Sequence, residues 1–410
     1  MTAHAPAAIT GIGLVSAAGI GRAANWKAVC SGVPTADAVD ALADAPVAFA
    51  STVPATFDAD RLTGHRASRN YDRSTQFALV AGREALDDAG LTPSVLEDAR
   101  VAVVVGTAFG GVRTFEEDHA RLIADGPGAV TARFLPKALA NMASGIPSIE
   151  FGATGPAMVV STACASGATA IGIGLGLLRS GAADVVLAGG TDASVTPLHV
   201  AGFHKLRALS RARRFPPARA SRPFDVGHDG FVMGEGAGIV VLERLSDAAA
   251  RGARAYARLA GYGATSDAHH ITAPHPDGRG AKEAIREACD DAGLVPADVG
   301  HINAHATSTP IGDAIEAGVV AEIAPNAVLT STKGVTGHPM GAAGAIEAAY
   351  TALALHTGTV PPVANLDRPC ERAKDLDLVM GGPRSQRVDT ALSNSFGFGG
   401  HNAVLAFTST

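Results

Sequence analysis

Cysteine is scarce in this chain of 410 residues. It occurs only at Cys30, Cys164, Cys289 and Cys370, and no two of these form a CxxC pair. We therefore do not expect a scaffold built on disulfides, and we expect a reducing compartment, the cytoplasm. Charged residues make up only 18% of the chain, and their net charge is −6. This balance argues against a protein that binds nucleic acid with its whole surface.

Long hydrophobic runs are also missing. The longest apolar runs, such as Ala168–Leu178, are shorter than the roughly 20 residues that a membrane span requires, so we expect no membrane segment. Residues 5–20 are uncharged, but they lack a basic start and contain several glycines, which predicts a buried strand and turn rather than a signal peptide. No GxxxxGK[ST] loop occurs, and Gly11-Ile-Gly13 lacks the third glycine of a dinucleotide-binding loop. The hydrophobic share of 47% predicts a folded chain rather than a disordered one.

The chain repeats its own pattern at long range. Five segments match five later segments in the same order, and the offset between them shrinks steadily, so we expect insertions in the first half. The largest insertion is expected between Gly13 and residue 85. The pairs are 9–16 with 259–266, 85–91 with 288–294, 103–106 with 302–305, 167–181 with 344–358, and 234–242 with 397–405.

Each half is predicted to run strand, amphipathic helix, strand, Gly/Ala-rich helix and hairpin. Val101–Val105 and Val185–Leu187 are short apolar runs of the kind found in strands buried on both faces. The helices expected at 164–179 and 341–356 carry small residues, which allow close backbone approach, so we place them together in the centre. The result is an α/β fold of two similar sheets around central helices, with an N-terminal half at 1–250 and a C-terminal half at 251–410.

Cys164 is the first candidate for chemistry. It follows apolar Met158-Val-Val160 and precedes the first Gly/Ala-rich helix, which predicts a strand-to-helix turn. The N-terminus of a helix favours a thiolate, the nucleophilic form of cysteine. The alternative is an inert buried cysteine, which is common in protein cores.

Two histidines are candidates to join this thiol. His305 ends the strand-like segment 302–305, and His338 lies in the turn of the second half that corresponds to the Cys164 turn. Catalytic groups gather at such carboxyl ends of strands. If a pseudo-twofold axis relates the halves, all three side chains face one site. A zinc site is the alternative, but His301 and His305 on one strand would lie about 13 Å apart, too far to share a metal.

A basic segment lies between residues 201 and 222, where no Asp or Glu occurs. On an acidic protein it could dock an acidic partner or a phosphate, although a solvated loop is the alternative. Its cations are Lys205, Arg207, Arg211, Arg213, Arg214, Arg219 and Arg222.

Four segments resemble the signatures of β-ketoacyl-[acyl-carrier-protein] synthases of the elongating type in type II fatty acid and polyketide systems. They are Val160-Ser-Thr-Ala-Cys-Ala-Ser-Gly167, Asn303-Ala-His-Ala-Thr-Ser-Thr-Pro310, Ser331-Thr-Lys-Gly-Val-Thr-Gly-His338 and Asn394-Ser-Phe-Gly-Phe-Gly-Gly400. The resemblance implies a thiolase-like fold, layered αβαβα, which agrees with the duplication. It implies a decarboxylative Claisen condensation, in which malonyl-carrier protein extends an acyl chain held on Cys164.

The same resemblance implies roles for further residues. His305 and His338 would stabilise the oxygen of the decarboxylating thioester. The backbone N–H groups of Cys164 and Phe398 would form an oxyanion hole. Lys333 and Glu316 would order the histidines and tune their electrostatics. Substrate-binding positions are Phe396 and Phe398 as gates of the acyl pocket, with Phe109, Phe203, Thr307 and Thr309 as its lining.

Two positions depart from the family pattern. Ala306 stands where the family usually has glycine, and His401 where it usually has threonine. The histidine adds a third imidazole near the glycine-rich turn at 397–400, where it could alter gating or the fit of a partner.

The resemblance also implies the partners. Acyl carrier protein would bring substrates on its phosphopantetheine arm, with Lys205, Arg207, Arg211, Arg213 and Arg214 as docking residues, and no cofactor or metal would be bound. The chain would form a homodimer, or a heterodimer with a chain-length-factor paralogue that lacks the nucleophile. A degradative thiolase is a rival, but it would need a second cysteine near the C-terminus, and the last one is Cys370.

Overall fold

The computed structural model describes residues 5–92, 96–97, 99–212 and 214–410. In the first half five strands and two helices match the repeat. They are β1 (Ala7–Ser16), α4 (Arg73–Ala89), β5 (Val101–Gly106), β6 (Ala157–Val160), α9 (Ser166–Arg179), β7 (Val185–Asp192) and β8 (Gly236–Arg244). Strand β1 is buried throughout, as expected for residues 5–20.

The second half repeats this order. Its elements are β9 (Ala257–Ser266), α12 (Arg279–Ala292), β10 (His301–Asn303), α13 (Pro310–Ile323), β11 (Val328–Thr330), α14 (Lys333–Thr336), α15 (Ala343–Thr357), β15 (Thr390–Gly397) and β16 (His401–Thr408). Helices α4 and α12 both end at a glycine in the left-handed region, Gly90 and Gly293. The matched Asp-Asp-Ala-Gly-Leu segments therefore form the same helix terminus twice.

The sheet order proves the duplication. In the first half the strands lie β6-β5-β7-β8-β1, and in the second half their counterparts lie β11-β10-β15-β16-β9. The expectation of two separate sheets is wrong in one respect. Strand β1 also pairs with β9 through Ala7, Ala8 and Ile9, so a single hydrogen-bonded path joins the two halves. A short strand, β13 (Asp377–Leu378), extends the second half beyond β11.

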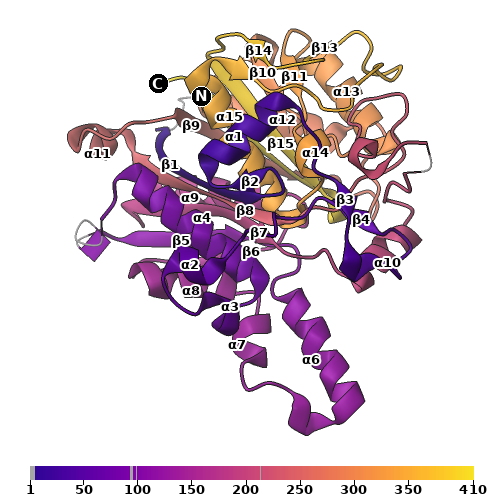
Figure 1. Cartoon of the computed structure of the whole chain (residues 1–410). Coiled ribbons are helices and arrows are strands. Elements are labelled where there is room, and N and C mark those ends of the chain that lie inside the picture. Colours follow the sequence, from indigo (N-terminus) through magenta and orange to yellow (C-terminus); the bar gives the residue numbers. More distant parts are fainter. Residues whose placement is uncertain (1–4, 93–95, 98, 213) are drawn as a thin grey trace.

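Helices α9 and α15 lie together in the centre, as their small residues predict (Figure 1). A Cβ atom added to Gly167 would lie 2.8 Å from the backbone nitrogen of Ala345, and one added to Gly344 would lie 2.8 Å from that of Ala168. Side chains at these glycines would push the two backbones apart. This close approach brings the starts of both helices, and hence the turns before them, to one place.

The structure contains two long insertions whose positions the repeat did not predict. Strands β7 and β8 pair antiparallel, but residues 193–235 separate them, so the first half has no tight hairpin like β15–β16. The second half carries its own long insertion, residues 358–389, between α15 and β15. Because the two insertions partly cancel, the sequence offset between the halves shows only their difference in length.

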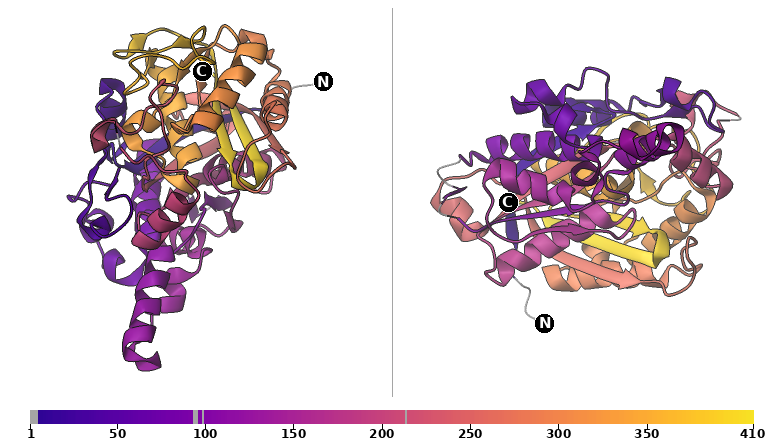
Figure 2. Two further views of the ribbon diagram at one scale, coloured as in Figure 1. Left: turned by 90° about the vertical axis from the view of Figure 1, so that its right-hand side faces the viewer. Right: turned by 90° about the horizontal axis from the view of Figure 1, so that it is seen from below.

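A helical arm projects from the body of the first half (Figures 1 and 2). It consists of α6 (Val112–Asp125) and α7 (Phe134–Ala138), followed by α8 (Met142–Phe151), which packs back near α4. The remaining insertions hold short elements. These are β2 (Gly19–Ile20), α1 (Arg22–Ser31), β3 (Asp37–Ala38), β4 (Phe49–Ala50), α2 (Ala59–Thr63), α3 (Ala67–Asn70), α10 (Pro197–Lys205), α11 (Leu245–Ala250), β12 (Thr359–Val360) and β14 (Arg384–Ser385). Within the described residues, no helix is both long and apolar enough to cross a membrane.

Candidate active site

Cys164 lies in a strained turn between β6 and α9, two residues ahead of the helix. Its neighbour Ala163 adopts a φ of 51°, in the left-handed region that residues other than glycine avoid. The hydroxyl of Ser166 holds this turn, since it donates to the carbonyl of Ala163 at 2.6 Å and accepts from the N–H of Thr162 at 2.9 Å. This strained residue lies next to the candidate nucleophile, and backbone strain is common at functional sites.

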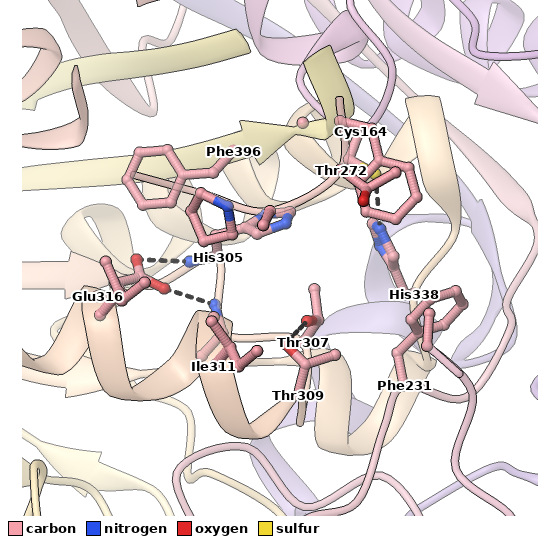
Figure 3. Close-up of a pocket in the computed structure, with 18 of the residues that line it drawn as sticks. Cys164, Phe231, Thr272, His305, Thr307, Thr309, Ile311, Glu316, His338 and Phe396 are labelled. Atoms are coloured by element: carbon pink, nitrogen blue, oxygen red, sulfur yellow. Dashed lines mark hydrogen bonds between the residues drawn. The ribbon is translucent and has the colours of Figure 1, made fainter. Parts of the chain in front are cut away.

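One cavity of about 290 Å³ brings the three predicted side chains together (Figure 3). The sulfur of Cys164 lies 3.0 Å from Nε2 of His338. The ring of His305 faces the same space, with its centroid 5.5 Å from that of His338. The spatial prediction made from the repeat is therefore met: a thiol from the first half and two imidazoles from the second half share one cavity.

The backbone of His338 is held from the first half. Its N–H donates to the carbonyl of Val232 at 2.8 Å, and its own carbonyl accepts from the N–H of Gly234 at 2.9 Å. The ring of Phe231 meets the imidazole edge-on, with centroids 5.4 Å apart. These contacts fix the direction in which Nε2 points.

Glu316 holds the backbone beside His305 from α13. One of its carboxylate oxygens accepts from the N–H of His305 at 2.9 Å and from the side-chain amide of Asn394 at 3.0 Å, and the other accepts from the N–H of Ala306 at 2.7 Å. Glu316 therefore holds the backbone of the histidine through hydrogen bonds to main-chain N–H groups. That it orders the histidine pair during catalysis stays a prediction.

Lys333 supplies the positive charge behind the site. Its ammonium group is fully buried and forms an ion pair with Glu347. Burial, and then the charge of Lys333, lower the pKa of both His305 and His338 well below the ordinary value. Both imidazoles are therefore neutral near pH 7, the form in which a ring offers one N–H donor and one acceptor nitrogen.

The protonation state of Cys164 differs from the expected thiolate. Although the residue keeps partial exposure to the cavity, burial raises the pKa of its thiol to about 12. Lys333 and the N–H groups of Phe398 and Cys164 itself lower this pKa, but burial outweighs them, and the negative charge of Asp192 adds to the rise. The structure thus describes a neutral thiol hydrogen-bonded to a neutral imidazole.

Alkylation of Cys164 tests this protonation state. With iodoacetamide we expect the rate to rise about tenfold per pH unit between pH 6 and pH 9, because the reactive thiolate stays a minor form throughout. Mass spectrometry of the Cys164 peptide measures the rate, and a Cys164→Ser protein gives the background from the other cysteines. A rate that stays flat from pH 6 to pH 8 would contradict the neutral pair, since it would mean a thiolate–imidazolium pair at rest.

Two buried carboxylates near the site were not predicted. Asp192, at the end of β7, accepts from the N–H groups of Ala108, Phe109 and Gly341 and from the hydroxyl of Thr107, so it ties two loops together behind Cys164. Burial raises its pKa to about 6. Its place at the carboxyl end of a buried strand was a usable signal.

Glu347 is the second of these carboxylates. It is buried in α15, and burial raises its pKa to about 7 despite the neighbouring Lys333. The signal in the sequence was an acidic residue alone in an otherwise apolar helix.

Most of the predicted substrate-binding residues line the cavity. They are Phe203, Thr307, Thr309, Phe396 and Phe398. The ring of Phe396 lies beside His305, with centroids 5.8 Å apart, and the hydroxyl oxygens of Thr307 and Thr309 are 3.1 Å apart (Figure 3). Phe109 does not belong to this wall. It packs instead against His199 and Phe203 outside the cavity.

The basic segment divides into paired and unpaired cations. Arg219 pairs with Asp367, and Arg222 is buried between Asp225 and Asp367. Among the described residues, the other cations of the segment make no ion pair and are exposed, and Arg207 also contributes to the cavity wall. These unpaired cations are Lys205, Arg207, Arg211 and Arg214. Arg213 lies outside the described residues.

The remaining candidates stay away from the thiol. The described residues contain no group of three or more His, Cys, Asp or Glu arranged to hold a metal ion. Cys370, the cysteine relevant to the thiolase alternative, is absent from the cavity wall, and so is the exposed His401. His401 lies beside the glycine-rich turn, where a Cβ atom at Gly399 would come 3.1 Å from its ring.

Comparison with known proteins agrees with the resemblance that the four sequence segments indicate. Residues 4–248 match the family described as "Beta-ketoacyl synthase, N-terminal domain", and residues 256–367 match "Beta-ketoacyl synthase, C-terminal domain". The chain is 43% identical over 406 residues to the 3-oxoacyl-[acyl-carrier-protein] synthase 2 of Synechocystis, and 42% identical over 405 residues to that of Staphylococcus aureus. Each alignment covers 97% of both chains.

Solved structures agree with these relatives. An ishigamide ketosynthase/chain length factor chain superposes with a TM-score of 0.93 at 33% identity, and the alignment covers 100% of both chains. A second match comes from a complex of a type II polyketide synthase acyl carrier protein with its ketosynthase. It has a TM-score of 0.91 at 30% identity and covers 99% of this chain and 100% of the other.

Proposed function

The chain belongs to the β-ketoacyl synthase family, whose members are acyltransferases that form carbon–carbon bonds, and we propose that it condenses a malonyl thioester with an acyl chain carried on Cys164. The observation that carries this proposal is the contact of 3.0 Å between the sulfur of Cys164 and Nε2 of His338, with His305 in the same cavity.

The first step loads the acyl chain. As the sulfur of Cys164 attacks the thioester carbonyl, its proton passes to Nε2 of His338, which is a neutral acceptor because of its lowered pKa. The N–H groups of Cys164 and Phe398 point at the sulfur, and they are suited to hold the oxygen of the tetrahedral intermediate. The intermediate then collapses, the pantetheine thiol leaves with the proton, and the acyl chain remains on Cys164.

The second step forms the new bond. The malonyl thioester binds with its carbonyl oxygen between His305 and His338, whose neutral rings donate N–H groups to it. For this step His338 carries its ring proton on Nε2, whereas during loading it carries that proton on Nδ1 and Nε2 accepts from the thiol, so the ring exchanges its proton with water between the two steps. Loss of CO₂ places negative charge on that oxygen, and the two donors stabilise it. The resulting carbanion attacks the acyl carbon, the bond between that carbon and the sulfur of Cys164 breaks, and a β-ketoacyl product longer by two carbons leaves. The Cys164 thiolate then takes up one proton from water, which restores the neutral thiol. No step requires a metal or a resident cofactor.

A condensation assay tests the proposed reaction. Purified protein, acyl-carrier protein and malonyl-carrier protein are expected to yield β-ketoacyl-carrier protein, detected by intact mass. Acyl-carrier protein without the malonyl donor is the control, and it should leave only an acyl group on Cys164. A protein that loads the acyl group but never forms the β-keto product would contradict the proposal.

Acyl carrier protein is the proposed macromolecular partner. Lys205, Arg207, Arg211 and Arg214 are exposed cations that make no ion pair with another described residue, and Arg207 belongs to the cavity wall. The attraction of such a patch for an acidic protein is screened by salt. Binding should weaken about tenfold between 50 and 200 mM salt, as measured by calorimetry, and Lys205→Gln should reduce that slope. Arg387→Gln, which removes an exposed arginine elsewhere, is the control. An affinity that salt does not change would remove the basis for this docking site.

The subunit partner is proposed to be a second copy of the chain or a paralogue without the nucleophile. A matched structure that contains both a ketosynthase and a chain length factor favours testing the second arrangement. Mass determination of the subunits that copurify distinguishes the two.

A further inference from the structure

A second cavity, of about 530 Å³, opens beside the first. Its wall is formed by residues 207, 209–212, 214–215 and 220 and by the turn at 227–229, and Arg207 belongs to the walls of both cavities. The steps proposed above do not use this space. Its volume lies within the range of small-molecule sites, roughly 300–1,000 Å³, and exceeds what a single phosphate would fill.

The second cavity is lined by positive charge. Arg207, Arg211 and Arg214 contribute to its wall, and none of them makes an ion pair with another described residue. Of the described residues in the wall, only Asp229 carries a carboxylate. Guanidinium groups present forked N–H donors that match phosphate oxygens, so an unpaired set of them around a hollow is suited to a phosphorylated ligand.

A buried imidazole completes the wall. The side chain of His228 is only 8% exposed, and its Nδ1 lies 3.2 Å from a carboxylate oxygen of the buried Asp313. Asp313 also accepts from the N–H groups of Phe224 and Thr309, so it is fixed in place. Asp313 thereby orients the imidazole through Nδ1. The other ring nitrogen, Nε2, makes no hydrogen bond within the described part of the chain.

We propose that this second cavity binds the nucleoside-diphosphate end of coenzyme A, so that acyl-coenzyme A can load Cys164 directly. The inference rests on the proposed function, because the pantetheine arm is common to coenzyme A and carrier protein. Because Arg207 lines both cavities, an arm that extends from Cys164 along the first cavity and past Arg207 would place the group beyond the arm at the second cavity. A carrier protein has one phosphodiester there, whereas coenzyme A has a diphosphate, a nucleoside and a 3′-phosphate, which better match the volume and the arginines.

The loading step balances without a further reactant. The thioester bond of acyl-coenzyme A breaks, and a thioester bond to the sulfur of Cys164 forms. The proton of the Cys164 thiol passes through His338 to the departing sulfur, and free coenzyme A leaves. The second cavity takes no part in this bond exchange and contributes only binding of the donor.

Calorimetry with adenosine 3′,5′-bisphosphate and with coenzyme A tests the site. Both should bind the intact protein, and the double variant Arg211→Gln/Arg214→Gln should weaken each by about tenfold or more. Neither arginine lines the first cavity, so loading of Cys164 from S-acyl pantetheine should be unchanged while KM for acyl-coenzyme A rises. Arg387→Gln is the matched control and should bind both probes like the original protein.

The alternative results are distinct. Adenosine 3′,5′-bisphosphate that does not bind at millimolar concentration, or that binds the double variant equally well, would overturn the proposal. A double variant that loses only carrier-protein affinity would overturn it too, because the arginines would then serve protein docking alone. If Cys164 accepts no acyl group from any donor while the nucleotide binds as expected, the proposed function fails and the nucleotide site stands.

Discussion

The Cys164→Ser protein should acquire no acyl group from acyl-carrier protein. Serine keeps the size of the side chain, but its hydroxyl is a far weaker nucleophile than sulfur, and the neutral His338 at 3.0 Å is too weak a base to compensate. Loss of an enzyme nucleophile costs several orders of magnitude, so we expect loading to fall by at least ~10³-fold. Intact-protein mass after incubation measures the adduct.

A matched substitution separates this effect from general disruption. Cys370→Ser changes a half-buried cysteine that does not line the cavity, and its loading should remain close to that of the original protein. An acyl adduct of undiminished amount on Cys164→Ser would refute the assignment of the nucleophile. An adduct that disappears from both variants would point to a loss of folding.

Removal of both imidazoles should end the release of CO₂ from malonyl-carrier protein. This step needs donors to the thioester oxygen but not the thiol, so Cys164→Ala or Cys164→Gln should still decarboxylate malonyl-carrier protein while condensing nothing. Addition of His305→Ala and His338→Ala to Cys164→Ala removes both donors. The loss of one oxyanion donor costs about 10²- to 10³-fold, so the loss of two should bring CO₂ release to background. Trapping of labelled CO₂ measures the rate.

The control for the histidine variants is His269→Gln in the same Cys164→Ala protein. His269 is exposed and outside the cavity wall, so CO₂ release should persist. Release that survives the loss of both His305 and His338 would count against their assignment as donors. Replacement of His305 or His338 alone by a residue of similar size adds a further check. If the ring only fills space, the rate of CO₂ release should not fall.

Local patterns in the sequence predicted most of the elements around the site. Apolar runs predicted β5 and β7, and the glycine within each Asp-Asp-Ala-Gly-Leu segment predicted the end of a helix. Small residues predicted the central pair of helices, α9 and α15. These features follow from side-chain size and backbone freedom within a few residues. The repeat then predicted that Cys164, His305 and His338 would meet, because related halves place their corresponding turns around one axis.

The insertions and the joining of the sheets were beyond such reasoning. Residues 193–235 and 358–389 lie in opposite halves and partly cancel in the offset, so a comparison of the matched segments showed only their difference in length. The pairing of β1 with β9 depends on how the two halves meet. A repeat within one chain carries information about each half, but not about the contact between their edges.

The protonation of the site was decided by tertiary structure in the same way. A helix start predicts a thiolate, yet burial by segments far along the chain makes Cys164 a neutral thiol with a pKa of about 12. Asp192 and Glu347 lie near the site, on a strand and a helix, and neither belongs to a motif that was recognised in the sequence. Whether the arginines of the second cavity form ion pairs depends on which carboxylates the fold places near them.

The order of residues is thus sufficient to predict a candidate thiol, two candidate histidines and the duplicated frame, because side-chain size, spacing and repetition along the chain carry that information. The charge on each group and the extent of the binding surface depend on distances between remote segments. Electrostatic and desolvation energies vary steeply with those distances, and only the folded chain determines them.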